Sequence, residues 1–166
     1  MSILRAAIGA IALAGLALSL VETGPVRADN PKPMLDSDGV VRVKSAYPFD
    51  ETISRVKADI ASKGIMFFSA IDQAKLGAAA GVALPPSTLL TFGNPPLGTQ
   101  FITANPNAGL DWPVRLLVTE DAAGNVWTVF TEFNWIARRH RITNRDAQFK
   151  MASEVIASIT SSVAAR

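Results

Sequence analysis

The chain has 166 residues, of which 49% are hydrophobic and 18% charged, and it contains no cysteine. This length fits one domain with a short extension, and the hydrophobic fraction is too high for a disordered chain. The 16 basic and 14 acidic residues leave a formal charge of +2, which is too even for a protein that coats nucleic acid. The lack of cysteine excludes disulfides and thiolate metal sites, and the single histidine, His140, excludes a multi-histidine cage. We therefore expect no metal, no cofactor and no nucleic-acid partner.

Residues 1–28 have the order of segments that is typical of a secretory signal peptide. A basic start, Met1–Arg5, precedes the uncharged stretch Ala6–Val21, and a polar break leads to Val26-Arg27-Ala28. We expect cleavage after Ala28 and, for a bacterial source, a periplasmic or secreted location. The alternative is a retained membrane anchor, although the uncharged stretch is shorter than the roughly 20 residues that span a bilayer. In that case the uncleaved segment would be the membrane contact.

Residues 29–39, with their prolines and aspartates, are expected to form a flexible leader, and residues 40–166 a single domain. Within this domain, hydrophobic periodicity predicts five strands, at 40–46, 65–71, 88–92, 114–119 and 126–133. Apolar residues at helical spacing predict two long helices, and Asp and Pro start signals predict two short ones; the four ranges are 48–63, 145–164, 73–80 and 96–104. Residues 105–109 read as a loop, and Gly124-Asn125 suits a hairpin between the last two strands.

This order of elements predicts an α+β fold. We expect a two-layer sandwich in which a mixed or mainly antiparallel sheet of about five strands carries the two long helices on one face. A doubly wound parallel sheet fits poorly, because only one real crossover helix lies among the middle strands. The opposite face should then carry apolar side chains that support a homodimer, sheet to sheet or edge to edge. The residues expected there are Val41, Val43, Phe67, Leu89, Leu117 and Trp127.

Four short sequence motifs at the predicted turns contain the polar side chains of most interest. They are Phe68-Ser69-Ala70-Ile71-Asp72, Leu90-Thr91-Phe92-Gly93-Asn94-Pro95, Gly109-Leu110-Asp111-Trp112-Pro113 and Ala137-Arg138-Arg139-His140-Arg141-Ile142. From about Val43 to Val163, the chain resembles the bacterial family labelled domain of unknown function 302. The resemblance rests on Ile71-Asp72, Phe92-Gly93-Asn94-Pro95, Leu110-Asp111-Trp112-Pro113 and Arg139-His140. It implies a curved antiparallel sheet with helices on one face, an arrangement like that of the TATA-binding protein. It implies neither DNA binding nor an assigned activity.

The chain departs from the family pattern in two places. Trp112 stands where the family has an aliphatic residue. After the fifth strand, Phe130-Thr131-Glu132-Phe133 stands where the family tends to show a tyrosine and an Asn-Asp-Pro-like turn. If that tyrosine hydroxyl has a function in the family, this member has lost it.

The four motifs supply the candidate ligand-binding residues, which are Asp72, Phe92, Asn94, Pro95, Asp111, Trp112, Arg139 and His140. Each has a structural alternative: an aspartate can cap a helix, an asparagine can hold a turn, and the basic run around His140 can be a solvated turn. We expect most of them to line one concave patch at an end of the sheet, with apolar walls and convergent polar groups. The members of that patch are Phe92, Asn94, Pro95, Asp111 and Trp112, with His140 contributing.

No nucleophile elbow, phosphate-binding loop or zinc-protease motif occurs in the sequence. We therefore expect a non-enzymatic module that binds an unidentified small ligand or partner protein. The alternative is an enzyme in which Asp111, Glu132 and His140 act as acid and base groups, which requires them to surround one cavity. The sequence alone names no catalytic residue and no ligand.

Overall fold

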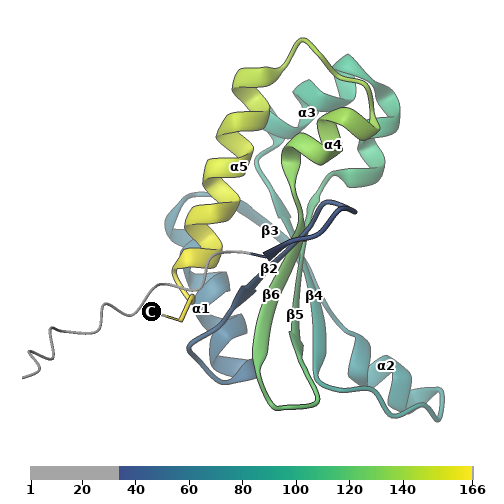
Figure 1. Ribbon diagram of the computed structural model, residues 1–166, viewed down its shortest axis with the longest axis vertical. Helices are drawn as coiled ribbons and strands as arrows, with labels where there is room; N and C mark the ends of the chain where they lie inside the picture. The colour runs from purple at the N-terminus through teal and green to yellow at the C-terminus, as the bar shows by residue number, and fades with distance from the viewer. Residues whose placement is uncertain (1–33, 166) are drawn as a thin grey trace, which may run out of the picture.

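The computed structural model describes residues 34–165 (Figure 1). The predicted signal peptide and the first five residues of the predicted leader, 29–33, therefore lie outside the described residues. The helices and strands are β1 (Met34–Leu35), β2 (Val40–Lys44), α1 (Phe49–Ser62), β3 (Met66–Asp72), α2 (Gln73–Ala79), β4 (Ser87–Gly93), α3 (Pro95–Ala104), the 3-10 helix η1 (Pro106–Asp111), β5 (Val114–Glu120), β6 (Val126–Thr131), α4 (Phe133–Arg139) and α5 (Asp146–Ser161).

The six strands form one sheet in the order β1-β2-β6-β5-β4-β3, and every neighbouring pair is antiparallel. Strands β2 and β3 consequently run in the same direction, but three strands separate them. Helix α1 is thus a crossover between the two sides of the sheet, without direct pairing of the strands that it joins. The late hairpin β5–β6 pairs as its Gly-Asn turn predicts.

The long helices α1 and α5 lie together on one side of the sheet (Figure 1). Their apolar faces meet inward-pointing residues of the central strands, and the most buried members of this core are Val56, Ile60, Leu90, Leu116, Val118, Ile159 and Val163. Helices α3 and α4 pack at one end of the sheet, whereas α2 projects near its other end (Figure 1). The predicted two-layer α+β fold, with an antiparallel sheet and two long helices on one face, is confirmed.

Three elements were not predicted: η1, which lies largely in the predicted loop 105–109, and β1 and α4. Met34–Leu35, placed by the sequence in a flexible leader, forms β1 and pairs with β2. Phe133–Arg139, divided by the sequence between a strand and a basic turn, forms α4. The helix begins there because the Glu132 carboxylate accepts the amide N–H groups of Asn134 and Trp135, both at 2.7 Å. Glutamate is an uncommon residue at this capping position, so the usual sequence signal for a helix start is missing.

The strand register corrects one part of the predicted open face. Val41 lies opposite Phe130, and Phe130 lies opposite Leu116, which is fully buried under the helices. Directly opposed residues share a face, so Val41 and, by the same pairing, Val43 belong to the covered side. Phe67 packs against the core as well. Leu89, Leu117 and Trp127 alternate with buried neighbours and so occupy the other face.

Candidate functional site

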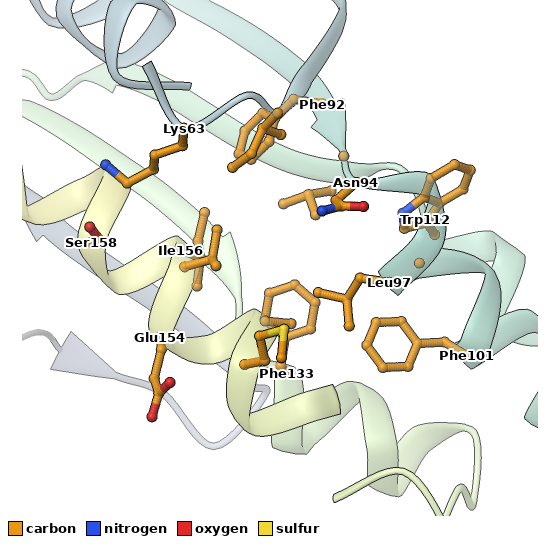
Figure 2. A pocket seen from close by; sticks show the side chains of 17 residues that line it. Lys63, Phe92, Asn94, Leu97, Phe101, Trp112, Phe133, Glu154, Ile156 and Ser158 are labelled. Carbon is orange, nitrogen blue, oxygen red and sulfur yellow. The ribbon is translucent and has the colours of Figure 1, made fainter. Parts of the chain in front are cut away.

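A cavity of about 390 Å³ lies between α5 and the end of the sheet from which α3 departs (Figure 2). Its size falls within the range of small-molecule sites, and mostly apolar side chains line it. The side chains that form its walls are Ile65, Phe92, Leu97, Phe101, Trp112, Val114, Phe133, Met151, Val155 and Ile156. A space of this kind can hold an apolar molecule, because apolar surface is removed from water on both partners.

Trp112 forms one wall of this cavity, and two glycines make room for its indole. A Cβ atom on Gly93 would lie 3.1 Å from Trp112 Nε1, and a Cβ on Gly98 would overlap the same atom. Gly98 lies in α3 and is buried, so the helix and the indole pack backbone against ring. Phe68 meets the same indole edge to face, with the ring centroids 6.0 Å apart. The position of the wall thus depends on the missing side chain of Gly98.

Asn94 brings a free polar group to the cavity. It stands at the N-cap of α3, yet its side chain makes no capping hydrogen bond. The reason lies in the next residues: Pro95 and Pro96 have no N–H to cap, and the amides of Leu97 and Gly98 already donate to the Asn94 carbonyl oxygen at 3.1 and 2.9 Å. Figure 2 shows the Asn94 amide between Phe92 and Trp112. Both its donor and its acceptor are therefore available to a bound molecule.

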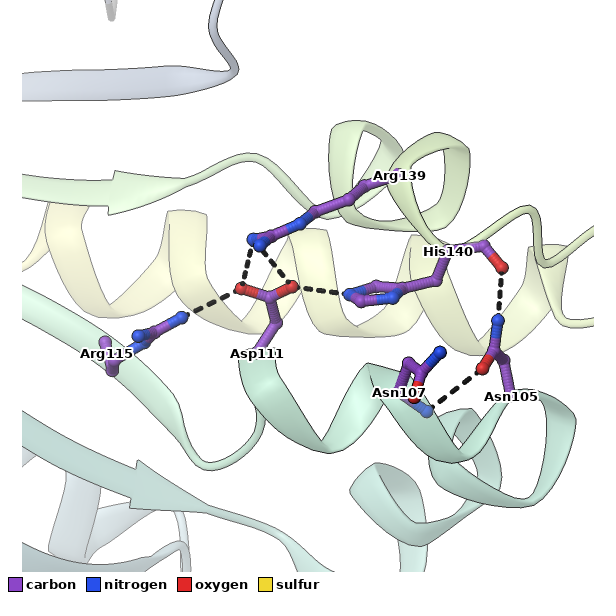
Figure 3. A network of polar contacts seen from close by, with 6 residues as sticks. All are labelled: Asn105, Asn107, Asp111, Arg115, Arg139 and His140. Atoms are coloured by element: carbon purple, nitrogen blue, oxygen red, sulfur yellow. Dashed lines mark hydrogen bonds and ion pairs between the residues drawn. The ribbon is translucent and has the colours of Figure 1, made fainter.

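Asp111 is the centre of a second, polar group of residues (Figure 3). Its side chain is 3% exposed and accepts hydrogen bonds from Arg115 Nη2 at 2.8 Å and from Arg139 Nη1 at 3.1 Å to each oxygen. His140 Nε2 lies 2.6 Å from Asp111 Oδ2. A carboxylate offers about four acceptor positions, and these four contacts use all of them.

The Asp111 cluster also joins separate elements of the chain. Asp111 ends η1, Arg115 lies in β5, and Arg139 and His140 end α4. Asn105 adds a further link, because its amide donates to the His140 carbonyl at 2.8 Å while its side-chain oxygen accepts the Asn107 N–H at 3.0 Å. These contacts close the ends of helices whose terminal polar groups would otherwise lack partners. The Asp111 cluster, formed by Asp111, Arg115, Arg139 and His140, thus links η1, β5 and α4.

The structure divides the predicted patch into these two groups. Phe92, Asn94 and Trp112 line the apolar cavity, whereas Asp111 lines a separate small hollow with Arg115 and Thr131. The two spaces share Val114 and Phe133 as a common wall, so the expected single patch is wrong. Asp111 turns to the other side of that wall because Arg139 and His140, brought there by α4, bind its carboxylate.

The remaining predicted residues have local roles. Pro95 begins α3 and does not line the cavity. Asp72 caps α2 by accepting the Lys75 N–H at 2.8 Å, as its structural alternative predicts. It lies at the opposite end of β4 from Asn94, because α2 precedes that strand and α3 follows it. Each Glu132 carboxylate oxygen accepts one N–H group of the α4 cap, and Glu132 does not line the hollow beside Asp111.

The sequence did not indicate several of the cavity residues, chiefly those of α3 and α5 such as Leu97, Phe101 and Met151. The sequence predicts the two helices that carry them, but apolar spacing along a helix does not show that a space remains beside a residue. Among residues 34–165, no group of three or more histidine, aspartate or glutamate side chains is placed to hold a metal ion. Within the same residues, no helix combines the length and the apolar character needed to cross a membrane.

Fold and site together define a two-layer α+β domain with an apolar cavity at one end of an antiparallel sheet. The family described as "Domain of unknown function DUF302" matches residues 41–165. The chain belongs to this family. A solved structure described as an uncharacterized conserved protein DUF302 from Bacillus stearothermophilus has the same fold, with a TM-score of 0.69 at 14% identity over 75% of this chain and 98% of that one.

Curated relatives give a different kind of similarity. The chain is 38% identical over 112 residues to fluoride-specific ion channel FluC 1 of Brucella suis biovar 1 (strain 1330), covering 68% of this chain and 44% of that protein. It is also 38% identical over 112 residues to fluoride-specific ion channel FluC 2 of Brucella melitensis biotype 1, covering 42% of that protein. The chain therefore spans less than half the length of the curated relatives that it matches.

Proposed function

We propose that this domain binds a small, largely apolar molecule in the cavity between α3, α5 and the end of β4. The observation that carries the proposal is the cavity itself: about 390 Å³ of space with apolar walls and one free amide, that of Asn94. Four aromatic rings, those of Phe92, Phe101, Trp112 and Phe133, line it and offer large apolar contact surfaces. A binding module of this kind needs no nucleophile, which agrees with the absence of catalytic motifs in the sequence.

The enzyme alternative receives less support from the geometry. Asp111 and His140 are in direct contact, as that alternative requires. However, Glu132 caps α4, and the Asp111 carboxylate has no acceptor position left for a substrate. A general base must reach the proton that it removes, and this carboxylate would first have to release one of its partners.

The proposal can be tested with N-phenyl-1-naphthylamine, a neutral apolar fluorophore whose emission rises in apolar surroundings. We expect saturable binding of one dye molecule per chain. Gly98→Ala should weaken it at least tenfold, because the added Cβ displaces the Trp112 wall. The matched control is Gly109→Ala, whose Cβ would meet only Ile102 Cδ1 at 4.0 Å and should leave binding unchanged.

Thermal unfolding of each variant shows whether it is folded at the temperature of the titration. If Gly98→Ala does not fold, Asn94→Asp replaces it: that side chain is exposed and makes no described hydrogen bond, so the melting temperature should stay near the wild-type value while binding falls. Absence of saturable dye binding to the wild-type domain would reject the proposal. Sodium fluoride, compared with sodium chloride, belongs in the same titration because the Brucella relatives carry fluoride in their names.

We further propose that the domain works outside the cytoplasm. The support is the order of basic, apolar and small residues in 1–28, which is typical of an exported precursor. A secreted chain that begins at Asp29, measured by intact mass, is the expected result. A full-length chain that stays with the membrane fraction would favour the anchor instead.

A further inference from the structure

We propose that the cavity selects ligands with an uncharged polar head, such as an alcohol or a primary amide on an aliphatic body, over carboxylates and amines of the same length. This inference rests on the proposed function and concerns the ligand class of the same site. It follows from the few polar groups that line the cavity and from what each of them already binds.

Lys63 is the cationic residue of the lining, and a partner already neutralises its charge. Its Nζ lies 2.6 Å from both carboxylate oxygens of Asp59, one helical turn earlier. Figure 2 shows the ammonium group directed away from the apolar centre of the cavity. A ligand carboxylate at this ammonium would share it with Asp59 in a partly exposed position, and it would gain little net energy there.

Glu154 is the anionic residue of the lining, and it too faces outward. Its side chain is 66% exposed, and Lys150 lies 3.5 Å from it. In Figure 2 its carboxylate points away from the cluster of aromatic rings. Water screens this charge, so at the rim it repels an anionic head weakly and attracts a cationic head equally weakly.

The N-terminus of α3 does not act as an anion site either. Helix N-termini attract anions through free N–H groups in their first turn. Here Pro95 and Pro96 have none, and the amides of Leu97 and Gly98 are spent on the Asn94 carbonyl. What remains are two neutral groups, the Ser158 hydroxyl and the Asn94 side chain, and each can both donate and accept a hydrogen bond.

An ionised head placed among these side chains would lose its hydration without gaining a partner, which is costly. A hydroxyl or amide head would keep a hydrogen bond to Asn94 while its chain replaces water along Leu97, Phe101 and Ile156. Each methylene that enters the cavity should tighten binding about fourfold until the space is filled. This dependence on chain length separates binding inside the cavity from adsorption at the surface.

The experiment is competition against N-phenyl-1-naphthylamine at neutral pH with 1-decanol, decanoate and decylammonium, all below their aggregation limits. We expect 1-decanol to compete at least tenfold better than either ion, and 1-octanol to be weaker than 1-decanol by the two missing methylenes. Asn94→Ala should weaken 1-decanol about fivefold, the effect of one hydrogen bond. The matched control is Asn134→Ala, an exposed asparagine of α4 that is not part of the lining.

Glu154→Gln should leave the affinity for 1-decanol unchanged. It should reduce the ratio of the affinity for 1-decanol to that for decanoate, because the negative charge at the rim is gone. If decanoate competes as well as 1-decanol, or if neither displaces the dye, the inference on ligand class is wrong while dye binding still supports the cavity. If the dye itself does not bind, the proposed function fails first. An unchanged affinity of Asn94→Ala for 1-decanol would remove Asn94 as the head-group partner and overturn the inference.

Discussion

At the scale of single residues, the Asp111 carboxylate holds together three segments that are distant in the chain. It is nearly inaccessible to water and receives hydrogen bonds from Arg115, Arg139 and His140. The two arginines are about half exposed, so water screens part of their attraction, whereas His140 is as buried as the carboxylate. Water therefore screens the two arginine ion pairs more than it screens the Asp111–His140 contact.

We predict that Asp111→Asn lowers the free energy of unfolding by about 2 kcal/mol, because the amide keeps the shape but loses the charged acceptor. Urea unfolding at pH 7 measures this change. The matched control is Asp72→Asn, which makes the same chemical change at the cap of α2. Asparagine caps helices as well as aspartate does, so the control should change stability by only a few tenths of a kcal/mol. Equal effects of the two substitutions would show that the Asp111 cluster does not stabilise the fold.

At the scale of elements, the β5–β6 hairpin is organised by the side chain of Asp121. One carboxylate oxygen accepts the amide N–H groups of Ala123 and Asn125, both at 2.9 Å, and the other accepts Trp127 Nε1 at 2.9 Å. Gly124, with a φ of 78°, takes the left-handed conformation that closes the turn. The hydrogen bond from Trp127, followed by those from Asn125, lowers the pKa of Asp121 from 3.8 to about 2.

This shift predicts how stability depends on pH. A carboxylate whose pKa is lower in the folded state stabilises the fold above its unfolded pKa, and the contribution is lost as pH falls through the folded value. Wild type should therefore be more stable than Asp121→Asn at pH 7 and at pH 4. The difference should shrink between pH 4 and pH 2.

Thermal unfolding at pH 7, 4, 3 and 2 measures the difference in stability between wild type and Asp121→Asn. These pH values bracket the unfolded and folded pKa values of Asp121. The control is Asp38→Asn, because the described hydrogen bond of that carboxylate comes only from its neighbour Ser37. The melting temperature of Asp38→Asn should change with pH in parallel with that of the wild type. A constant gap between wild type and Asp121→Asn at every pH would contradict the assignment.

At the scale of the whole molecule, the β3 side of the sheet is the exposed apolar region. Among the strands of residues 34–165, β3 ends the sheet and pairs with β4 alone. Large apolar side chains on β3, on α2 and on the loop that follows α2 are 40% to 61% exposed. They are Met66, Phe68, Ile71, Leu76, Val82 and Leu84. An edge with free backbone groups and apolar side chains can pair with a second copy of itself in antiparallel fashion.

The homodimer expected from the sequence therefore stays a prediction, now assigned to this edge. Analytical ultracentrifugation at a protein concentration on the order of tens of micromolar should show a dimer for the wild type and a monomer for Phe68→Lys. The matched control is Leu110→Lys, which puts the same charge on a 67% exposed apolar residue of η1. A monomeric wild type at that concentration would count against self-association.

The sequence predicted most of the described elements because their signals are local. Alternating or helical spacing of apolar residues indicated five of the six strands and both long helices, and the motifs around Asp72, Asn94 and Asp111 indicated the family. Asp72 was placed correctly as a helix cap because a cap involves residues only a few positions apart. Phe92 and Asn94 precede α3 and Trp112 follows η1, and the three residues line one cavity, as the sequence grouped them.

Tertiary structure decided the rest, since the missing information concerns residues far apart in the chain. The register that turns Val41 toward the helices depends on β6, and the position of Asp111 depends on α4, which begins at a glutamate cap that sequence signals do not favour. The cavity exists because α5 packs beside α3 without filling the space between them. Apolar periodicity specifies which side of a helix is buried, whereas the volume left between two helices is set by how their side chains interdigitate in three dimensions.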